Sequence, residues 1–194
     1  MITFIIFLAI GYVVGSLSSA IIVCKLLGLP DPRTTGSQNP GTTNVLRLGG
    51  KVPAAITLVG DIFKGILPVM LAKAFGIHGV MLGLIGVAAL IGHIYPVFFG
   101  FKGGKGVATA LGACIGLSLG LGVAMLVTWL IVAVVFRYSS LAALIAAVLA
   151  PIYAAIFTQW GYFLPVLIIT AILIWRHLDN IKRLRAGTET KIYL

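Results

Sequence analysis

Residues 92–109 read GHIYPVFFGFKGGKGVAT and separate two strongly apolar segments of the chain. The stretch carries Lys102 and Lys105 among several glycines, with His93 and Pro96 near its start. A glycine-rich turn exposes backbone N–H groups that can surround an anion, and lysine ammonium groups add positive charge. Lysines at the end of a membrane span also serve as plain interfacial anchors. From this stretch alone, a phosphate site and an anchor are equally reasonable interpretations.

The composition of the chain is that of a polytopic membrane protein. Of its 194 residues, 60% are hydrophobic and 9% are charged, and the mean hydropathy is +1.15. A soluble core does not need so much apolar sequence. The formal charge of +10 fits the positive-inside rule and contact with anionic lipid headgroups, so we expect membrane lipid and no nucleic acid as a partner. Cys24 and Cys114 stand alone, which argues against a disulfide framework or a zinc site.

The apolar segments predict an all-α protein with seven transmembrane helices, forming one domain over residues 1–194. The N-terminus lacks the basic region and cleavage site of a signal peptide, so the first segment is expected to be retained as a span. Residues 107–136 are too long for one span of roughly twenty residues, and their glycines favour two short spans. The expected spans cover residues 2–24, 52–75, 79–98, two segments of 107–136 that turn near residues 118–122, 141–157 and 162–175.

Seven spans place most of the positive charge on one face of the membrane. The loops after spans one, three and five and the C-terminal tail lie together, and they carry all of the 14 lysines and arginines except Lys64 and Lys73. The positive-inside rule makes this face cytoplasmic, with the N-terminus outside and the C-terminus in the cytoplasm. Six spans would split these charges between the two faces, which favours seven.

Three polar stretches are expected to converge on the cytoplasmic face: residues 36–47, 92–109 and 177–191. The first offers short hydroxyl and amide side chains that suit phosphate oxygens, and an arginine that can bind phosphate with two hydrogen bonds: Ser37, Asn39, Thr42, Thr43, Asn44 and Arg47. In the third, His177, Asn180 and Arg183 share a face if the last helix continues beyond the bilayer. Taken singly, the first stretch also fits an ordinary polar loop and His177 an ordinary surface residue.

Several chemistries are disfavoured by what the sequence lacks. The only carboxylates are Asp31, Asp61, Asp179 and Glu189, and no two are adjacent, which argues against a paired-carboxylate hydrolase or a carboxylate-rich metal site. Lys105 is followed by glycine, so the stretch is not a P-loop, and no GxSxG nucleophile elbow occurs. The His-x4-Asp arrangement of the common acyl-CoA-dependent glycerolipid acyltransferases is also missing.

Asp61 and Lys64 lie three residues apart inside the second span and form a candidate buried ion pair. Charged side chains inside the membrane are functional candidates by default. A single isolated pair makes a poor transport pathway, so we interpret it as a structural pair or as a support for the site.

The stretches GSQNPGTTNVLR, GHIYPVFFGFKGGKGVAT and HLDNIKRLRAGTETK resemble the three motifs of the PlsY family, in the same order and at similar separation. This family comprises bacterial membrane enzymes with seven spans. The resemblance implies transfer of a fatty acyl group from acyl phosphate to the 1-hydroxyl of glycerol 3-phosphate, giving lysophosphatidic acid and inorganic phosphate. Gln38, where the family usually has glycine, and Thr42, where alanine is usual, are departures in the first loop.

The resemblance also implies a two-phosphate site on the cytoplasmic side of the inner membrane, with no metal or cofactor. A soluble acyl-phosphate synthase is a further expected partner. Lys105, Arg47, His177 and Ser37 are the expected catalytic residues. The residues expected to bind the substrates and their phosphates are Ser37, Asn39, Gly41, Thr43, Asn44, Arg47, Gly103, Gly104, Lys105, Ser140, His177 and Asn180.

Two roles are open for His177. It can act as a general base for the glycerol hydroxyl, or it can donate a hydrogen bond to phosphate while a phosphate oxygen takes the proton. Among so many cations we favour the second role. Lys102 is expected at the rim of the site, and His93 is expected to make a structural hydrogen bond at the end of the third span.

The rival interpretation from another class is a membrane transporter for an anionic solute. A transporter predicts polar groups near the bilayer midplane, broken spans and an internal repeat. Here the polar stretches gather on one face and the two halves show no repeat. A protein that only binds lipid headgroups would explain the basic face but not three separate polar motifs.

Overall fold

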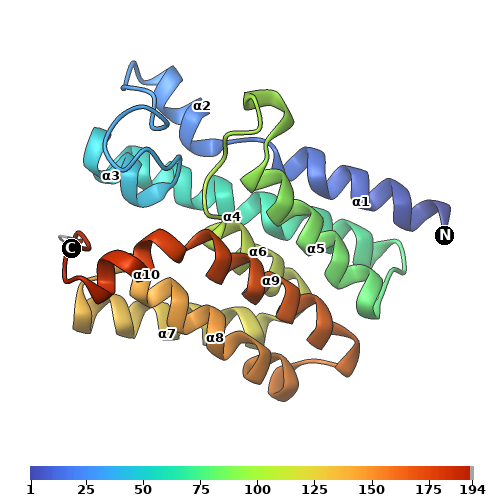
Figure 1. Cartoon of the computed structure of the whole chain (residues 1–194). Coiled ribbons are helices and arrows are strands. Elements are labelled where there is room, and N and C mark those ends of the chain that lie inside the picture. The colour runs from blue at the N-terminus through green and yellow to red at the C-terminus, as the bar shows by residue number, and fades with distance from the viewer. Residues whose placement is uncertain (193–194) are drawn as a thin grey trace.

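The computed structural model describes residues 1–192, which form helices and connecting loops without any β-strand. Figure 1 shows the long helices running side by side, with α2, α3, α10 and the C-terminus at one end of the molecule and the N-terminus at the other. The helices are α1 (Ile2–Gly15), α2 (Ser19–Leu26), α3 (Thr42–Gly49), α4 (Lys51–Ala74), α5 (Gly79–Ile94), α6 (Val107–Leu117), α7 (Leu119–Phe136), α8 (Ser139–Phe157), α9 (Phe163–Arg176) and α10 (Leu178–Arg185). Two 3-10 turns cover Val97–Phe99 and Trp160–Tyr162.

Within residues 1–192, five segments are long and apolar enough to cross a membrane: Ile2–Leu26, Lys51–Ala74, Gly79–Phe99, Leu119–Phe136 and Ser139–Phe157. A sixth is formed if Trp160–Arg176 and Leu178–Arg185, which meet at an angle of 56°, count as one bent span. The chain is therefore an all-α integral membrane protein, and this part of the prediction is confirmed. Seven full spans are not reached by length, because α6 has 11 residues and extends about 16 Å across a hydrocarbon core of about 30 Å.

The predicted turn within residues 107–136 lies at Ser118, between α6 and α7. Ser118 is in an extended conformation and its side-chain oxygen accepts a hydrogen bond from the backbone N–H of Leu121, 3.5 Å away, which caps α7. The two helices differ in length more than the sequence suggested. Only α6 is short, whereas α7 with 18 residues is an ordinary span.

Small residues allow the helices to pack closely. A Cβ atom added to Gly15 of α1 would lie 2.1 Å from the carbonyl oxygen of Ala89 in α5, and one added to Gly65 of α4 would lie 2.2 Å from the carbonyl oxygen of Thr109 in α6. Both helix pairs pack with backbones in contact, as small residues at membrane helix interfaces permit.

The expected first span is present as Ile2–Leu26, but its helix is interrupted, because α1 ends at Gly15 and α2 begins at Ser19. Lys64 of α4 donates a hydrogen bond from Nζ to the carbonyl oxygen of Leu17 in the break, at 2.8 Å. The same Nζ lies 2.9 Å from Asp61 Oδ1, and both side chains are almost fully buried. The predicted ion pair therefore exists, and it satisfies a backbone carbonyl that the broken helix leaves without a partner.

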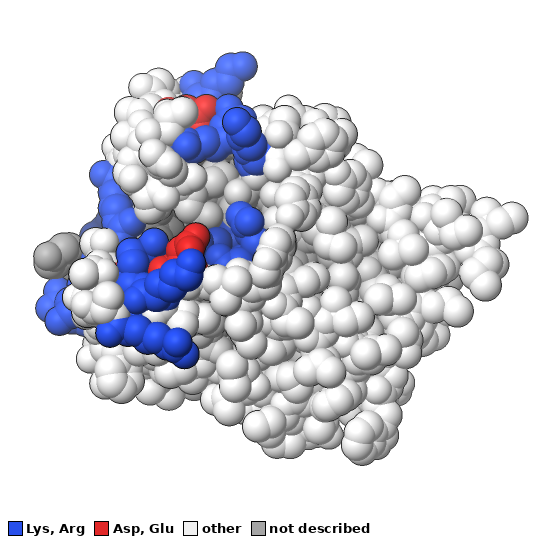
Figure 2. All heavy atoms as spheres, in the orientation of Figure 1, with Lys and Arg blue, Asp and Glu red and all other residues white. Residues whose placement is uncertain are grey.

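Positive charge gathers at one end of the molecule. On the face shown in Figure 2, lysine and arginine cover the end formed by α2, α3, α10 and the C-terminus, whereas the rest of that face carries no charged side chains. This distribution agrees with the charge segregation read from the sequence. All three polar stretches lead to this end.

Candidate active site

The second and third polar stretches meet through Lys105 and Asn180. Lys105 follows Gly104 in the loop before α6, and its Nζ donates a hydrogen bond to Asn180 Oδ1 of α10. The Asn180 side chain is buried, with 4% of its surface exposed. Two segments 75 residues apart are thus joined at one partly buried polar contact.

Glu189 accepts hydrogen bonds from Asn180 and from two further side chains. Its Oε1 accepts hydrogen bonds from Asn180 Nδ2 at 2.6 Å and from Ser140 Oγ at 2.7 Å, while its Oε2 accepts one from Arg183 Nε at 2.7 Å. Burial by itself raises the pKa of Glu189, but these hydrogen bonds outweigh it and hold the pKa below its usual range. The carboxylate therefore stays charged and connects α8, α10 and the C-terminal tail.

Lys105 is charged but close to its titration range. Burial, and after it the nearby positive charge of Arg183, lower its pKa to about 8, whereas Glu189 acts in the opposite direction. An ammonium group that has already lost part of its hydration binds an incoming phosphate strongly, because low local dielectric strengthens the attraction. Lys105 is thus suited to hold an anion at neutral pH.

His177 sits at the 56° bend between α9 and α10 and is buried, with 3% of its surface exposed. The last helix therefore bends here and does not continue straight, although Asn180 and Arg183 do share a face and both contact Glu189. His177 Nδ1 lies 2.7 Å from the carbonyl oxygen of Leu173. That oxygen only accepts, so Nδ1 carries the proton. Burial lowers the pKa of His177 to about 4, and the neutral ring therefore presents Nε2 as an acceptor.

The first polar stretch is held by Asn44. Its buried amide donates from Nδ2 to the carbonyl oxygens of Pro32 and Thr35, both at 3.0 Å, and its Oδ1 accepts from the N–H of Ser37 at 3.0 Å. In this structure the predicted phosphate ligand Asn44 is fully engaged in shaping the loop. Ser37 itself is exposed, and its backbone N–H is not available to an anion.

Thr43 and Arg47 are four residues apart and lie on one face of α3. Thr43 Oγ1 is 3.3 Å from Ser139 Oγ at the start of α8. Ser139 precedes Ser140, a ligand of Glu189. The exposed Arg47 therefore lies on the face of α3 that contacts the start of α8 through Thr43.

Gly103 and Gly104 of the second stretch have their backbone N–H groups hydrogen-bonded within the protein. The N–H of Gly103 donates to the carbonyl oxygen of Ile94 at 3.1 Å, and that of Gly104 donates to the carbonyl oxygen of His93 at 3.3 Å. A Cβ on Gly103 would lie 1.9 Å from the carbonyl oxygen of His93. The glycines thus let the loop pack against the end of α5, and their N–H groups are satisfied there instead of surrounding an anion.

His93 packs against the same loop. Its Nδ1 is 3.1 Å from Thr109 Oγ1 in the buried interior, which confirms the predicted structural hydrogen bond. A Cβ on Gly104 would lie 2.3 Å from His93 Nε2 and 2.7 Å from the carbonyl oxygen of Pro40. Gly104 is therefore the point at which the first and second polar stretches touch.

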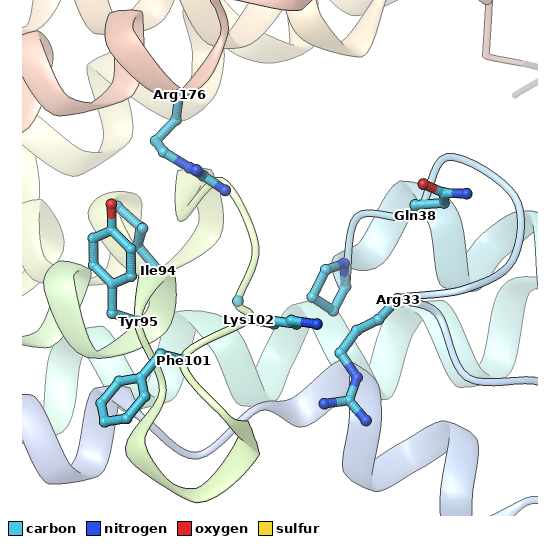
Figure 3. A pocket seen from close by; sticks show the side chains of 9 residues that line it. Arg33, Gln38, Ile94, Tyr95, Phe101, Lys102 and Arg176 are labelled. Carbon is cyan, nitrogen blue, oxygen red and sulfur yellow. The ribbon is translucent and has the colours of Figure 1, made fainter.

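A cavity of about 320 Å³ opens beside this point. Figure 3 shows Lys102 and Arg176 extending into the same open space, with Gln38 across from them. Arg176 also donates from Nη2 to the carbonyl oxygen of Gly104 at 3.4 Å. The lining is polar toward the first loop and apolar toward the end of α5: Arg33, Gln38, Pro40, Ile94, Tyr95, Phe101, Lys102, Gly103 and Arg176.

Comparison with known proteins assigns the chain to a family. The family model described as glycerol-3-phosphate acyltransferase matches residues 5–187. The chain belongs to the PlsY family of glycerol-3-phosphate acyltransferases. Glycerol-3-phosphate acyltransferases of Coxiella burnetii and Shewanella oneidensis are 51% and 50% identical to it, over 98% and 94% of this chain and 99% and 89% of their own lengths.

Two crystal structures of the PlsY protein YgiH, an integral membrane glycerol 3-phosphate acyltransferase, have the same fold. Its glycerol 3-phosphate form superposes with a TM-score of 0.92 at 37% identity, covering 98% of this chain and 96% of that one. Its lysophosphatidic acid form gives a TM-score of 0.90 at 35% identity, covering 98% and 95%. The fold and the family of this PlsY protein are therefore established together.

The structure brings together four of the twelve site residues that the sequence singled out. Lys105, Asn180 and Ser140 are joined through hydrogen bonds, and His177 lies in the electrostatic neighbourhood of Lys105. Glu189 was missed as a site residue because a carboxylate is unexpected among phosphate-binding cations. Arg176 was missed because it appeared to be one of several basic residues ending a span.

Proposed function

We propose that this PlsY protein transfers a fatty acyl group from acyl phosphate to the 1-hydroxyl of glycerol 3-phosphate, releasing lysophosphatidic acid and inorganic phosphate. The reaction runs in a single domain, on the cytoplasmic side of the bacterial inner membrane, with seven crossings counting the short α6. The YgiH forms with glycerol 3-phosphate and lysophosphatidic acid support the acceptor and the product. A soluble acyl-phosphate synthase is the proposed source of the donor.

The observation that carries this proposal is a pair of cationic positions that flank Gly103 and Gly104 in the sequence. Lys105 follows these glycines and lies near Arg183, whereas Lys102 precedes them and lines the cavity together with Arg176. Acyl phosphate and glycerol 3-phosphate are both polyanions that repel each other. Two adjacent cationic positions lower this repulsion and hold the two reactants in contact.

The two positions suit different phosphates. The cavity has an apolar side made by Ile94, Tyr95 and Phe101, and Tyr95 and Phe101 are exposed at the protein surface. An amphipathic anion fits there, with its phosphate at Lys102 and Arg176 and its acyl chain along the apolar side. We assign acyl phosphate to the cavity.

Glycerol 3-phosphate is assigned to the other position. Lys105 and Arg47 would bind its phosphate, together with the hydroxyls of Ser37 and Thr43 and the amide of Asn39. Asn180 and Ser140 contribute indirectly, through their hydrogen bonds to Glu189. Asn44, Gly41, Gly103 and Gly104 shape the loops that carry these groups.

The chemical step needs little acid catalysis. The 1-hydroxyl oxygen attacks the acyl carbon, the new C–O bond forms, and the bond between the acyl carbon and the phosphate oxygen breaks. His177 Nε2 accepts the hydroxyl proton, which passes to the departing phosphate. The ammonium group of Lys105 stabilises the negative charge that develops on the acyl oxygen. The unprotonated Nε2 favours this role over the phosphate-donor role first expected.

Charge-removing variants test the site. Lys105→Ala and Arg47→Ala are expected to fold in detergent and to lose most transfer, while Lys182→Ala, an exposed cation of α10 paired with Asp179, keeps wild-type activity. Near-full activity in both site variants would overturn the phosphate assignment. Replacing acyl phosphate by acyl-CoA is expected to abolish product formation, and equal use of acyl-CoA would refute the proposed donor.

A further inference from the structure

The C-terminal tail reverses direction directly after α10. Gly187 has a φ of +68°, its N–H donates to the carbonyl oxygen of Leu184 at 3.2 Å, and the N–H of Thr188 donates to that of Arg183 at 2.9 Å. This pair of hydrogen bonds is the Schellman motif, which needs a residue of positive φ and therefore favours glycine. The motif sends the tail back across α10 toward α8.

The described part of the tail carries an apolar anchor, Ile192, outside the polar site. Ile192 has 6% of its surface exposed and packs with Val132, Ala133 and Ala142 of α7 and α8. Its N–H donates to the carbonyl oxygen of Arg137, between these helices, at 2.8 Å. The neighbouring Lys191 holds its Nζ 5.7 Å from the centre of the Tyr138 ring, within range of a cation–π contact.

Glu189 lies between the reversal at Gly187 and the anchor at Ile192. Its side chain is 9% exposed and receives hydrogen bonds from both α8 and α10. Neither helix supplies this carboxylate itself. Its position thus depends on the two ends of the tail segment.

Glu189 also fixes the orientation of Asn180. A carboxylate only accepts hydrogen bonds and an ammonium group only donates them. Asn180 therefore turns its NH2 toward Glu189 and its oxygen toward Lys105. Without the carboxylate, only the ammonium group of Lys105 would orient the amide, and the Asn180 NH2 group would have no acceptor in this contact.

We propose that residues 187–192 form a positioning strap, in which Ile192, anchored between α7 and α8, holds Glu189 where it orients Asn180 toward Lys105. Ile192 touches no substrate and acts only through Glu189. This inference rests on the proposed function, since the reaction is its readout. It adds an apolar positioning residue that none of the polar motifs contains.

The test compares Ile192→Asp, Ile192→Ala and the conservative Ile192→Val in purified, folded enzyme. Misplacement of a positioning group by about 1 Å can cost about 100-fold, so kcat/KM for glycerol 3-phosphate is expected to fall about tenfold to 100-fold in the Asp variant and less in the Ala variant. The Val variant keeps the wild-type value. If the Asp variant does not fold, the Ala variant decides.

Two further readouts separate positioning from loss of structure. The negative charge of Glu189 raises the pKa of Lys105, so release of the strap moves the alkaline limb of kcat/KM to lower pH, as does Glu189→Gln. Combining Ile192→Ala with Glu189→Gln is expected to cost no more than Glu189→Gln alone. The strap would be overturned if the Asp and Ala variants kept the wild-type kcat/KM, or if the alkaline limb of their pH profiles did not move. It would also be overturned if the effects of Ile192→Ala and Glu189→Gln multiplied in the double variant.

Failure of the strap is distinguishable from failure of the proposed function. Wild-type enzyme that releases no phosphate from acyl phosphate in the presence of glycerol 3-phosphate would refute the function and the strap with it. Active wild-type enzyme with unaffected Ile192 variants would refute the strap alone.

Discussion

Lys105 Nζ and Asn180 Oδ1 are hydrogen-bonded across 75 residues of sequence. This contact joins the glycine-rich loop before α6 to the helix that follows the bend at His177. It is also the link between the buried ammonium group and the carboxylate of Glu189. The titration of the Lys105 ammonium group therefore gives a direct test of the site.

The pH dependence of phosphate binding follows from Lys105. Its pKa is lowered from the usual value to about 8, chiefly by burial, so the free enzyme loses this positive charge as the pH rises through about 8. The second pKa of a phosphate monoester is about 6, so the substrate does not titrate in that range. We expect kcat/KM for glycerol 3-phosphate, measured from pH 6 to pH 10, to fall on the alkaline side.

Lys105→Arg is the control for this profile, because a guanidinium group stays charged throughout the measured pH range. The variant is expected to show no alkaline limb near pH 8, whatever its overall rate. A limb that persists unchanged in Lys105→Arg would show that another group titrates there.

His177→Asn tests the proton acceptor. Asparagine keeps a hydrogen-bond donor but supplies no basic nitrogen, so loss of general-base catalysis is expected to lower kcat by about 100-fold or more. The KM for glycerol 3-phosphate should change little, because the phosphate is bound by other groups. Steady-state kinetics of the variant give both values, and a kcat close to that of wild type would exclude His177 as the acceptor.

Lys64→Met tests the buried ion pair. The variant leaves the Asp61 carboxylate without its cation and the Leu17 carbonyl without its donor. Removing one partner of a buried pair typically costs about 3 to 5 kcal/mol of folding free energy. We expect a much lower thermal unfolding temperature in detergent, partly restored by adding Asp61→Asn; unchanged unfolding would contradict the structural role.

Gln38→Gly tests backbone strain in the first loop. Gln38 has a φ of 55°, a left-handed conformation that costs a side-chain-bearing residue about 1 to 2 kcal/mol, part of which is offset by the larger unfolded-state entropy of glycine. The variant is expected to gain about 0.5 to 1 kcal/mol of stability in thermal or denaturant unfolding.

Gly36→Ala provides the opposite case in the same loop. Gly36 has a φ of +67°, and a Cβ there would lie 2.2 Å from Asn44 Oδ1. This variant should lose stability. If both substitutions shift stability in the same direction, the account of the loop is wrong.

Much of the fold follows from local sequence properties. Apolar length predicts the long helices, and the glycines and Ser118 predict the turn between α6 and α7. The break after Gly15 was not predictable, because it is stabilised by Lys64 from another helix. Such a tertiary hydrogen bond leaves no periodic signal in the first segment.

The sequence identified the polar stretches that form the site. Most of the hydrogen bonds between those stretches were not predictable. Lys105 and Asn180 were identified because their residue types suit phosphate. Glu189 depends on a chain reversal, and the only local signal for it is Gly187 after a helical segment. The N–H groups of Gly103 and Gly104 were assigned to an anion because their pairing with α5 is not visible from spacing.

The central claim is acyl transfer between two phosphate-bearing substrates. The most direct test incubates purified wild-type enzyme with acyl phosphate, with and without glycerol 3-phosphate, and measures inorganic phosphate and lysophosphatidic acid together. The account predicts that both products appear at equal rates and only when glycerol 3-phosphate is present. Phosphate release that does not depend on glycerol 3-phosphate, or the absence of lysophosphatidic acid, would contradict it.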